Sequence, residues 1–194
     1  DGAINMSPTM QVVANILMAA EYTLRLDRTQ GATTTRATFH RKNGVFYRHS
    51  VDNAQGIHTL QMVDGHDAII RVGQELFSLP VGEAGTTSRV ALDPGEIAAL
   101  GNANNVQTVL ISAGLPPETA QAFAVDIAGA VFRGDVLKVE YDAGAPTADM
   151  GFLILGGPSR RWMLTPRTVG EQVHTDIRTL DAATFAASIL ALID

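Results

Sequence analysis

The same order of predicted elements occurs twice in this chain of 194 residues, and that repetition limits the folds open to it. In the first half, apolar residues at helical spacing follow Ser7-Pro8, a good helix start. Four strand-like segments then lead to a second helix, capped by Asp64. In the second half, a helix from Pro117 precedes four further strands and a closing helix capped by Asp181. Both halves therefore read α-β-β-β-β-α.

Local patterns predict where the strands of both halves lie. Tyr22, Leu24 and Leu26 alternate with polar residues, as in a half-buried strand. Asn43-Gly44 is a strong signal for a two-residue hairpin turn. A strand is therefore expected on each side of this turn. The expected strands are 22–26, 36–42, 45–51 and 57–62 in the first half, and 135–141, 150–155, 160–165 and 172–179 in the second.

A helical connector over 79–115 separates the two repeats, which we place at about 7–78 and 116–194. Asp93-Pro94-Gly95-Glu96 resembles a capping box, and a further helix is expected over 103–113, ended by Gly114. The polar stretch Thr86–Arg89 is expected to be a surface loop. The sequence thus predicts one compact α+β domain over 1–194. Its two halves are related by a pseudo-twofold axis and share a mainly antiparallel sheet.

Composition excludes several classes of function. The chain has no cysteine, which removes disulfides, thiolate nucleophiles and cysteine-ligated metal sites. Its net charge of −6 argues against general nucleic-acid binding, which needs a basic surface. No apolar run approaches the roughly 20 residues that span a bilayer, and no signal-like segment opens the chain. We expect a cytoplasmic protein with neither a nucleic-acid nor a membrane partner.

Catalytic and cofactor motifs are not recognisable in the sequence. Gly156-Gly157 has the spacing of neither a Walker loop nor a dinucleotide fingerprint. Ser112 precedes Gly114 by two residues, but Leu110 stands where a nucleophile elbow needs glycine. Asp126 is the one unusual acid, because it lies in an apolar helical stretch, and we expect it to face solvent. The sequence predicts no enzyme, no cofactor and no metal.

Five histidines offer the main alternative to that prediction. None forms an i, i+4 pair of the kind found in metalloproteases. The Asn43-Gly44 turn pairs His40 with Tyr47 and brings His49 onto the same sheet face. Such a face is ordinarily hydrogen-bonded or solvated, but a proton relay or metal site stays open. His58 and His174 are a second such pair, which a pseudo-twofold axis could bring together.

A basic hairpin region stands out in this acidic protein. Residues 25–48 hold six of the 14 basic residues and only one acid. The same turn pairs Phe39 with Arg48 and Arg41 with Phe46, so one face mixes aromatic and cationic groups. Such composition suits a protein interface, whereas stacking on single-stranded nucleic acid is a weaker reading. The ordinary alternative is a solvated strand pair whose arginine stems cover apolar surface.

Several stretches resemble the EspG family of cytoplasmic chaperones of mycobacterial type VII (ESX) secretion. They are Tyr22-Thr-Leu-Arg-Leu26, Gly44-Val-Phe-Tyr-Arg48, Ile57-His-Thr-Leu-Gln-Met-Val63 and Leu110-Ile-Ser-Ala-Gly-Leu115, followed by a glycine-containing hairpin at 151–163 and the closing amphipathic helix. The family's additional N-terminal strand and helices are not expected in this sequence, and Asn43-Gly44 makes a minimal turn where the family's hairpin loop is often longer.

The resemblance implies a quasi-twofold α+β fold that binds the helical tip of PPE proteins and keeps PE–PPE pairs soluble until export. It implies a non-enzymatic chaperone or adaptor with a protein client. The expected partner-binding residues are Phe39, Arg41, Lys42, Asn43, Gly44, Phe46, Arg48, Gly114, Leu115 and Pro116. Two alternatives remain. One is a domain that self-associates as a homodimer through strand edges or the helix 181–192, and the other is a small enzyme that uses the His40, Tyr47 and His49 face.

Overall fold

The computed structural model describes residues 7–52, 55–81, 88–100, 105–170 and 172–194. In the first half the elements are α1 (Pro8–Met18), β1 (Tyr22–Gln30), β2 (Thr33–Lys42), β3 (Val45–Asp52), β4 (Ile57–Val63) and α2 (Gly65–Leu76). The connector holds β5 (Ser88–Ala91), α3 (Pro94–Ala99) and α4 (Val106–Ser112). The second half holds α5 (Pro117–Ala128), β6 (Phe132–Asp142), β7 (Ala145–Gly156), β8 (Arg161–Val169), β9 (Gln172–Thr179) and α6 (Ala182–Ile193). Both halves therefore have the predicted order α-β-β-β-β-α.

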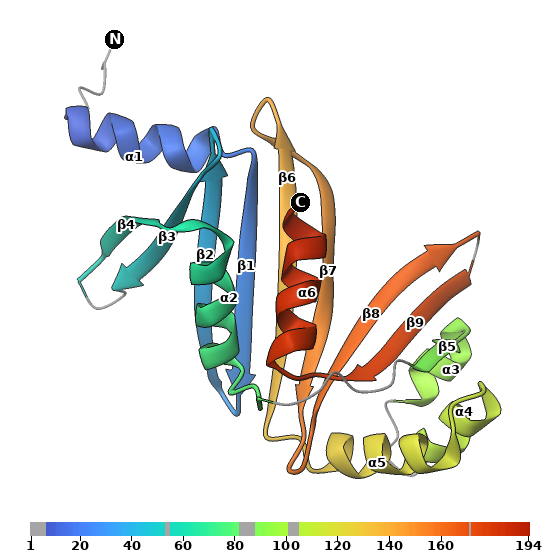
Figure 1. The fold of residues 1–194 in the computed structure, drawn as a ribbon. Coiled ribbons are helices and arrows are strands. Elements are labelled where there is room, and N and C mark those ends of the chain that lie inside the picture. The colour runs from blue at the N-terminus through green and yellow to red at the C-terminus, as the bar shows by residue number, and fades with distance from the viewer. Residues whose placement is uncertain (1–6, 53–54, 82–87, 101–104, 171) are drawn as a thin grey trace.

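All nine described strands form one antiparallel sheet in the order β4-β3-β2-β1-β6-β7-β8-β9-β5. The order is symmetric about the central β1–β6 pair, apart from the connector strand β5 at one edge. Figure 1 shows the matching arrangement of helices, with α1 and α2 on one side of that pair and α5 and α6 on the other. The predicted fold class, α+β with two pseudo-twofold halves, is confirmed.

Two hydrophobic clusters lie on opposite faces of the second half of the sheet. Ile154 of β7 and Met163 of β8 belong to a core beneath α2 and α6. Their neighbours Leu155 and Trp162 belong to a second core, with residues of α4 and α5. Successive side chains of a strand point to opposite faces. The helices α2 and α6 therefore cover one face, and α4 and α5 cover the other.

Local signals placed most helix ends correctly. Ser7 and Asp181 cap α1 and α6 with their side chains, and Asp93 and Glu96 form the predicted capping box of α3. At the end of α4, Leu115 N donates to Leu110 O and Gly114 N to Ile111 O, the two bonds of a Schellman motif. Gly114 has the positive φ, +100°, that this motif needs.

Several predicted boundaries were wrong. Ser88 and Arg89 were expected in a loop but lie in β5, which pairs with β9; Thr86 and Thr87 lie outside the described residues. β7 begins at Ala145 rather than Met150, because its first residues are held by pairing with β6 despite weak strand propensity. The helix expected over 103–113 begins at Val106, and residues 103–104 lie outside the described part.

In both halves the outer hairpin diverges from the centre of the sheet. β2 pairs with β3 only from Thr38 to Lys42. β7 pairs with β8 only from Leu153 to Gly156, although it pairs with β6 along nearly its whole length. The hairpin β8–β9 consequently tilts away from β7, as Figure 1 shows. This divergence opens the groove described next.

Candidate docking surface

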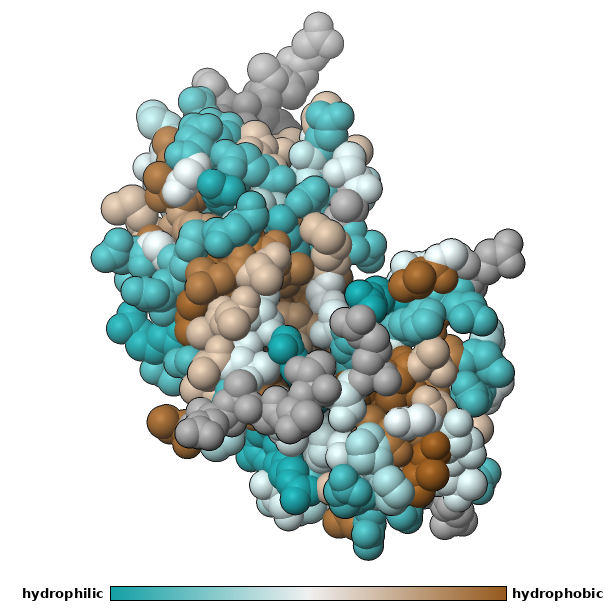
Figure 2. Space-filling view, turned by 45° about the vertical axis from the view of Figure 1, so that its right-hand side comes forward, coloured by the Kyte–Doolittle hydropathy of each residue, from teal (hydrophilic) through white to brown (hydrophobic). Residues whose placement is uncertain are grey.

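The solvent-facing side of α6 is apolar, which is unusual for a surface helix. Residues 182–193 include no charged side chain, and Phe185, Ile189 and Ile193 are buried in the core. On the opposite side, Ala183, Ala187 and Ala191 are exposed, and Leu190 is 36% exposed. Figure 2 shows hydrophobic surface gathered on this side of the molecule. A helix that is apolar all round is normally covered on all sides, so this face is a candidate contact surface.

A groove of about 790 Å³ adjoins α6, between β7 and β8. Met150, Phe152 and Leu153 line it from β7, Met163 from β8 and Leu192 from α6. Met150 is 46% exposed and Leu153 52% exposed, whereas Phe152 and Met163 form the buried floor. The apolar surface of α6 thus continues into a concave site, which is the geometry in which apolar side chains of a ligand are best buried.

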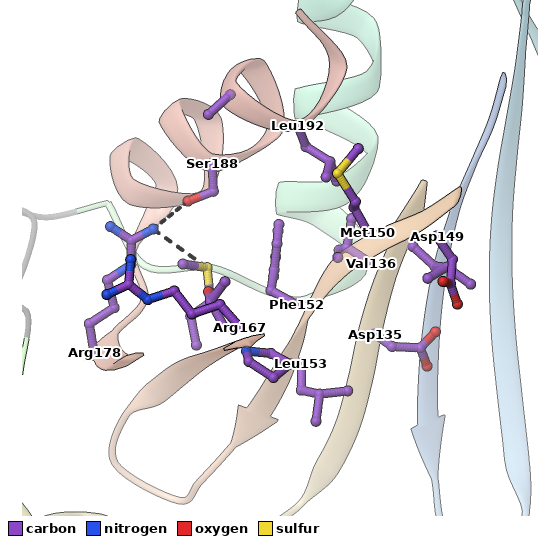
Figure 3. A pocket seen from close by; sticks show the side chains of 16 residues that line it. Asp135, Val136, Asp149, Met150, Phe152, Leu153, Arg167, Arg178, Ser188 and Leu192 are labelled. Carbon is purple, nitrogen blue, oxygen red and sulfur yellow. Dashed lines mark hydrogen bonds between the residues drawn. The ribbon is translucent and has the colours of Figure 1, made fainter. Parts of the chain in front are cut away.

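Charged residues of opposite sign lie at the two sides of this groove. Arg167 and Arg178 stand on one side and Asp135 and Asp149 on the other, with the apolar residues between them, as Figure 3 shows. Arg178 donates to Ser188 Oγ at 2.7 Å, which fixes its guanidinium against α6. Partial burial lowers the pKa of Arg178, although nearby Asp176 and Asp181 oppose this shift.

The predicted contact residues lie in two separate places. Asn43 and Gly44 form the exposed turn between β2 and β3, whereas Gly114 and Pro116 are exposed between α4 and α5 at the other end of the molecule. Phe39 and Phe46 are buried beneath α2, and Leu115 is buried in the second core. The aromatic rings of the predicted face therefore belong to the core rather than to the surface. Arg41, Lys42 and Arg48 are half-buried.

Most of the basic hairpin residues contact groups of their own chain. Arg36 makes a bidentate ion pair with Asp27, through Nε–Oδ1 and Nη2–Oδ2 distances of 2.7 Å each. Arg41 Nε lies 3.5 Å from Glu21 Oε2, and its guanidinium lies over the Tyr22 and Phe46 rings. Arg25 pairs with Asp27 and Asp135, Arg28 donates to Leu76 O and Lys42 to Asn15. The ordinary alternative, arginines that pack along the sheet, accounts for this local excess of charge.

Three of the four histidines of the first half, His40, His49 and His58, form with Thr23 a hydrogen-bonded row across four strands. Thr23 Oγ1 lies 2.9 Å from His40 Nδ1, His40 Nε2 lies 3.4 Å from His49 Nδ1, and His49 Nε2 lies 2.9 Å from His58 Nδ1. When every imidazole is neutral, each junction has one donor and one acceptor. The predicted shared face of His40, Tyr47 and His49 is confirmed by the strand register.

Burial keeps the inner histidines of this row neutral. His40 is 8% exposed, and burial lowers its pKa to about 4, with a smaller contribution from His49. Burial also lowers the pKa of His49, assisted by His58. His58 and His174 do not meet, because β4 lies at one edge of the sheet and β9 lies near the other. The row lies outside the groove and ends at an exposed edge strand.

Asp126 does not face solvent, as the sequence suggested, but is 1% exposed. Its Oδ2 accepts a hydrogen bond from Trp162 Nε1 at 2.8 Å, and its Oδ1 accepts one from Ser159 N at 3.1 Å. The carboxylate thus links α5 to β8 and to the turn that precedes it. The expectation of a solvent-facing side chain was wrong, because the two donors that satisfy the buried carboxylate lie more than thirty residues further along the chain and could not be identified from the sequence.

Two other features, a metal-binding cluster and a helix long enough to cross a bilayer, are absent from the described part of the chain. No cluster of three or more histidine, aspartate or glutamate side chains there could hold a metal ion. Among the same residues, no helix combines the length and hydropathy that crossing a bilayer requires. The sequence pointed to α6 as a route to self-association and as part of the EspG resemblance, but it did not indicate the groove. The absence of charge over 182–193 was the signal that could have pointed to an exposed apolar helix.

Comparison with known proteins supports the fold. No protein-family model matches the sequence, and no curated protein matches it. Among solved structures, the chain is similar to the Mycobacterium tuberculosis type VII secretion system chaperone EspG5, solved in complex with a PE25-PPE41 dimer. The TM-score is 0.74 and the sequence identity 12%, over 99% of this chain and 80% of EspG5. At this identity, the similarity establishes that the chain has an EspG-like fold.

Proposed function

We propose that this protein is a cytoplasmic, non-enzymatic chaperone or adaptor that binds an apolar segment of a client protein before export. The observation that carries the proposal is the uncharged, exposed side of α6, which continues into the groove between β7 and β8. Exposed apolar surface of this kind marks interaction sites. The EspG-like fold supports a client of the PE–PPE type.

The exposed members of the predicted contact regions remain part of this proposal. Asn43 and Gly44 at one end, and Gly114 and Pro116 at the other, would be secondary contacts of a large client. The buried rings Phe39 and Phe46 would support the hairpin from beneath.

Co-expression with a PE–PPE pair from the same host tests the proposal. We expect the wild-type chain to raise the soluble fraction of the pair and to co-elute with it in size-exclusion chromatography. Ala187→Glu should abolish both effects without loss of stability, because Ala187 is exposed. Ala98→Glu, at an exposed alanine of α3, is the matched control. A client pair that stays insoluble, or one bound equally well by Ala187→Glu, would refute the proposal.

Self-association is a second candidate, favoured by a specific feature of α6. Ala183, Ala187 and Ala191 recur every fourth residue on the exposed side, so that a second helix could approach closely. Light scattering across a hundredfold range of protein concentration separates self-association from client binding by a monomer. A mass that rises toward the dimer, and falls in Ala187→Glu, supports self-association, whereas a constant monomer mass excludes it.

A further inference from the structure

No described strand pairs with the outer edge of β7 where it borders the groove. β7 continues from Leu153 back to Ala145 in register with β6, but its pairing with β8 stops at Leu153. On the facing wall, residues 165–169 of β8 pair with β9 and not with β7. Half of the backbone N–H and C=O groups of an edge strand point outward and form a template for another strand. The groove therefore has a backbone edge as well as apolar side chains.

The shape of the groove favours an extended segment over a helix. Its two strands are direct neighbours at the Leu153–Leu164 pair and diverge from there. A strand needs a spacing of about 4.8 Å from its neighbour, whereas a helix with its side chains is roughly 10–12 Å wide. Close to the Leu153–Leu164 pair, the space beside β7 is therefore wide enough for a strand but too narrow for a helix. Of the two walls, β7 is the better template, because Pro166 of β8 lacks an N–H.

The charges of the groove match the alternation of a strand. Ladder register places Met150, Phe152 and Met163 on the face beneath α6, together with Arg167 and Arg178. Asp135, Asp149 and Leu153 lie on the other face. Because successive side chains of a strand point to opposite faces, an added strand would present every second residue to the arginines and the others to the aspartates.

We propose that the groove takes up an extended segment of the client, which pairs as an additional strand with residues 147–152 of β7. Its apolar and acidic side chains point toward α6, Arg167 and Arg178. Its basic side chains point toward Asp135 and Asp149. This inference rests on the proposed function, because it names the kind of client segment that the groove binds.

A synthetic peptide tests the inference without the client. The probe is a fluorescein-labelled peptide of nine residues. One face of the extended peptide carries valine and glutamate, and the other face carries lysine. Its affinity is measured by fluorescence anisotropy. Two further peptides carry N-methyl groups on every second backbone amide. The first is methylated at the odd-numbered residues and the second at the even-numbered residues, and these two patterns are the two methylation phases. One phase removes the amides that would face β7, and the other removes those that face away. We expect at least a tenfold loss of affinity in one phase only, with deuterium exchange slowed over 147–152.

Charge reversal provides a second measurement on the folded protein. Arg167 is exposed, so Arg167→Glu should fold normally and bind the peptide at least fivefold more weakly. A peptide with lysine in place of glutamate should recover that loss. Arg160→Glu, in the exposed turn before β8, is the matched control and should bind like the wild type.

The possible failures of the two proposals can be told apart. Absence of peptide binding, equal losses in both methylation phases, or exchange protection confined to α6 would each overturn strand addition. If the PE–PPE pair is nevertheless solubilised and Ala187→Glu abolishes this, the chaperone proposal stands and the client binds in another form. If the peptide binds as expected but no pair is solubilised, strand recognition stands and the assigned client is wrong.

Discussion

At the scale of single residues, the buried His40 of the histidine row makes the stability of the protein depend on pH. His40 lies second in the row, bonded to Thr23 and His49, and burial lowers its pKa to about 4. In the unfolded chain its pKa is near 6.5. Below that value the unfolded state binds the proton more readily, so the free energy of unfolding falls as pH falls from 6.5 toward 4. Above pH 7, His40 is neutral in both states and contributes almost no pH dependence.

The expected loss is up to about 3 kcal/mol between pH 6.5 and pH 4. Urea unfolding at half-unit pH steps measures it. Because acidic residues also titrate in this range, the difference between wild type and His40→Gln isolates the contribution of the row. His174→Gln, which removes a histidine outside the row, should keep the wild-type slope. Parallel slopes for wild type and His40→Gln would show that His40 is not held neutral by folding.

The buried carboxylate of Asp126 is the second polar group with a predictable effect on stability, because it accepts two hydrogen bonds. Asp126→Ala removes the acceptor of Trp162 Nε1 and of Ser159 N, and leaves two donors unpaired. We expect a loss of about 2–4 kcal/mol in the free energy of unfolding. Fluorescence of the single tryptophan in urea titrations reports it directly. Asp142→Ala, at an exposed aspartate, should change stability by less than about 0.5 kcal/mol, and an equally small effect at Asp126 would contradict the prediction.

At the scale of elements, the sequence predicted the identity and order of most helices and strands correctly, but it placed several of their boundaries wrongly. The turn Asn43-Gly44 set the register of β2 and β3, because a two-residue hairpin allows one pairing. β5 was missed because four residues carry almost no periodic signal, and only pairing with β9 makes them a strand. The groove could not be predicted, because it depends on where β8 leaves β7. That point is set by packing across the sheet rather than by local sequence.

The contact between α2 and α6 makes an element-scale prediction. Gly73 of α2 lies against Phe185 of α6, and a Cβ added there would overlap the Phe185 ring and lie 2.9 Å from Leu26 Cδ2. Alanine favours a helix over glycine by about 1 kcal/mol, yet we expect Gly73→Ala to destabilise the protein by about 1–3 kcal/mol because of overpacking. Thermal unfolding measures it. Ala187→Gly, at an exposed site of α6, reports propensity alone; stabilisation by Gly73→Ala would mean that the helices are not in close contact.

At the scale of the whole molecule, the two halves share one sheet through the β1–β6 pair. Tyr22 to Thr29 of β1 pair with Arg133 to Glu140 of β6. The core beneath α2 and α6 takes residues from both halves, including Leu24, Phe39, Phe152 and Phe185. A seam with both backbone and side-chain contacts should couple the halves, so that neither unfolds alone. The prediction of a single domain therefore means that both halves unfold in one cooperative transition.

A substitution in one half, observed from the other, tests this coupling. Leu24 of β1 is fully buried, and Leu24→Ala should cost about 2–5 kcal/mol. Trp162 lies in the second half, on the opposite face of the sheet. If the halves unfold together, the urea midpoint must fall equally by Trp162 fluorescence and by far-UV circular dichroism, with an unchanged slope. Leu110→Ala, which changes another residue of the second core, should likewise shift both probes together. If Leu24→Ala lowered the dichroism midpoint but not the fluorescence midpoint, the repeats would be two independently folding units, and a client segment bound at β7 could leave the first half unaffected.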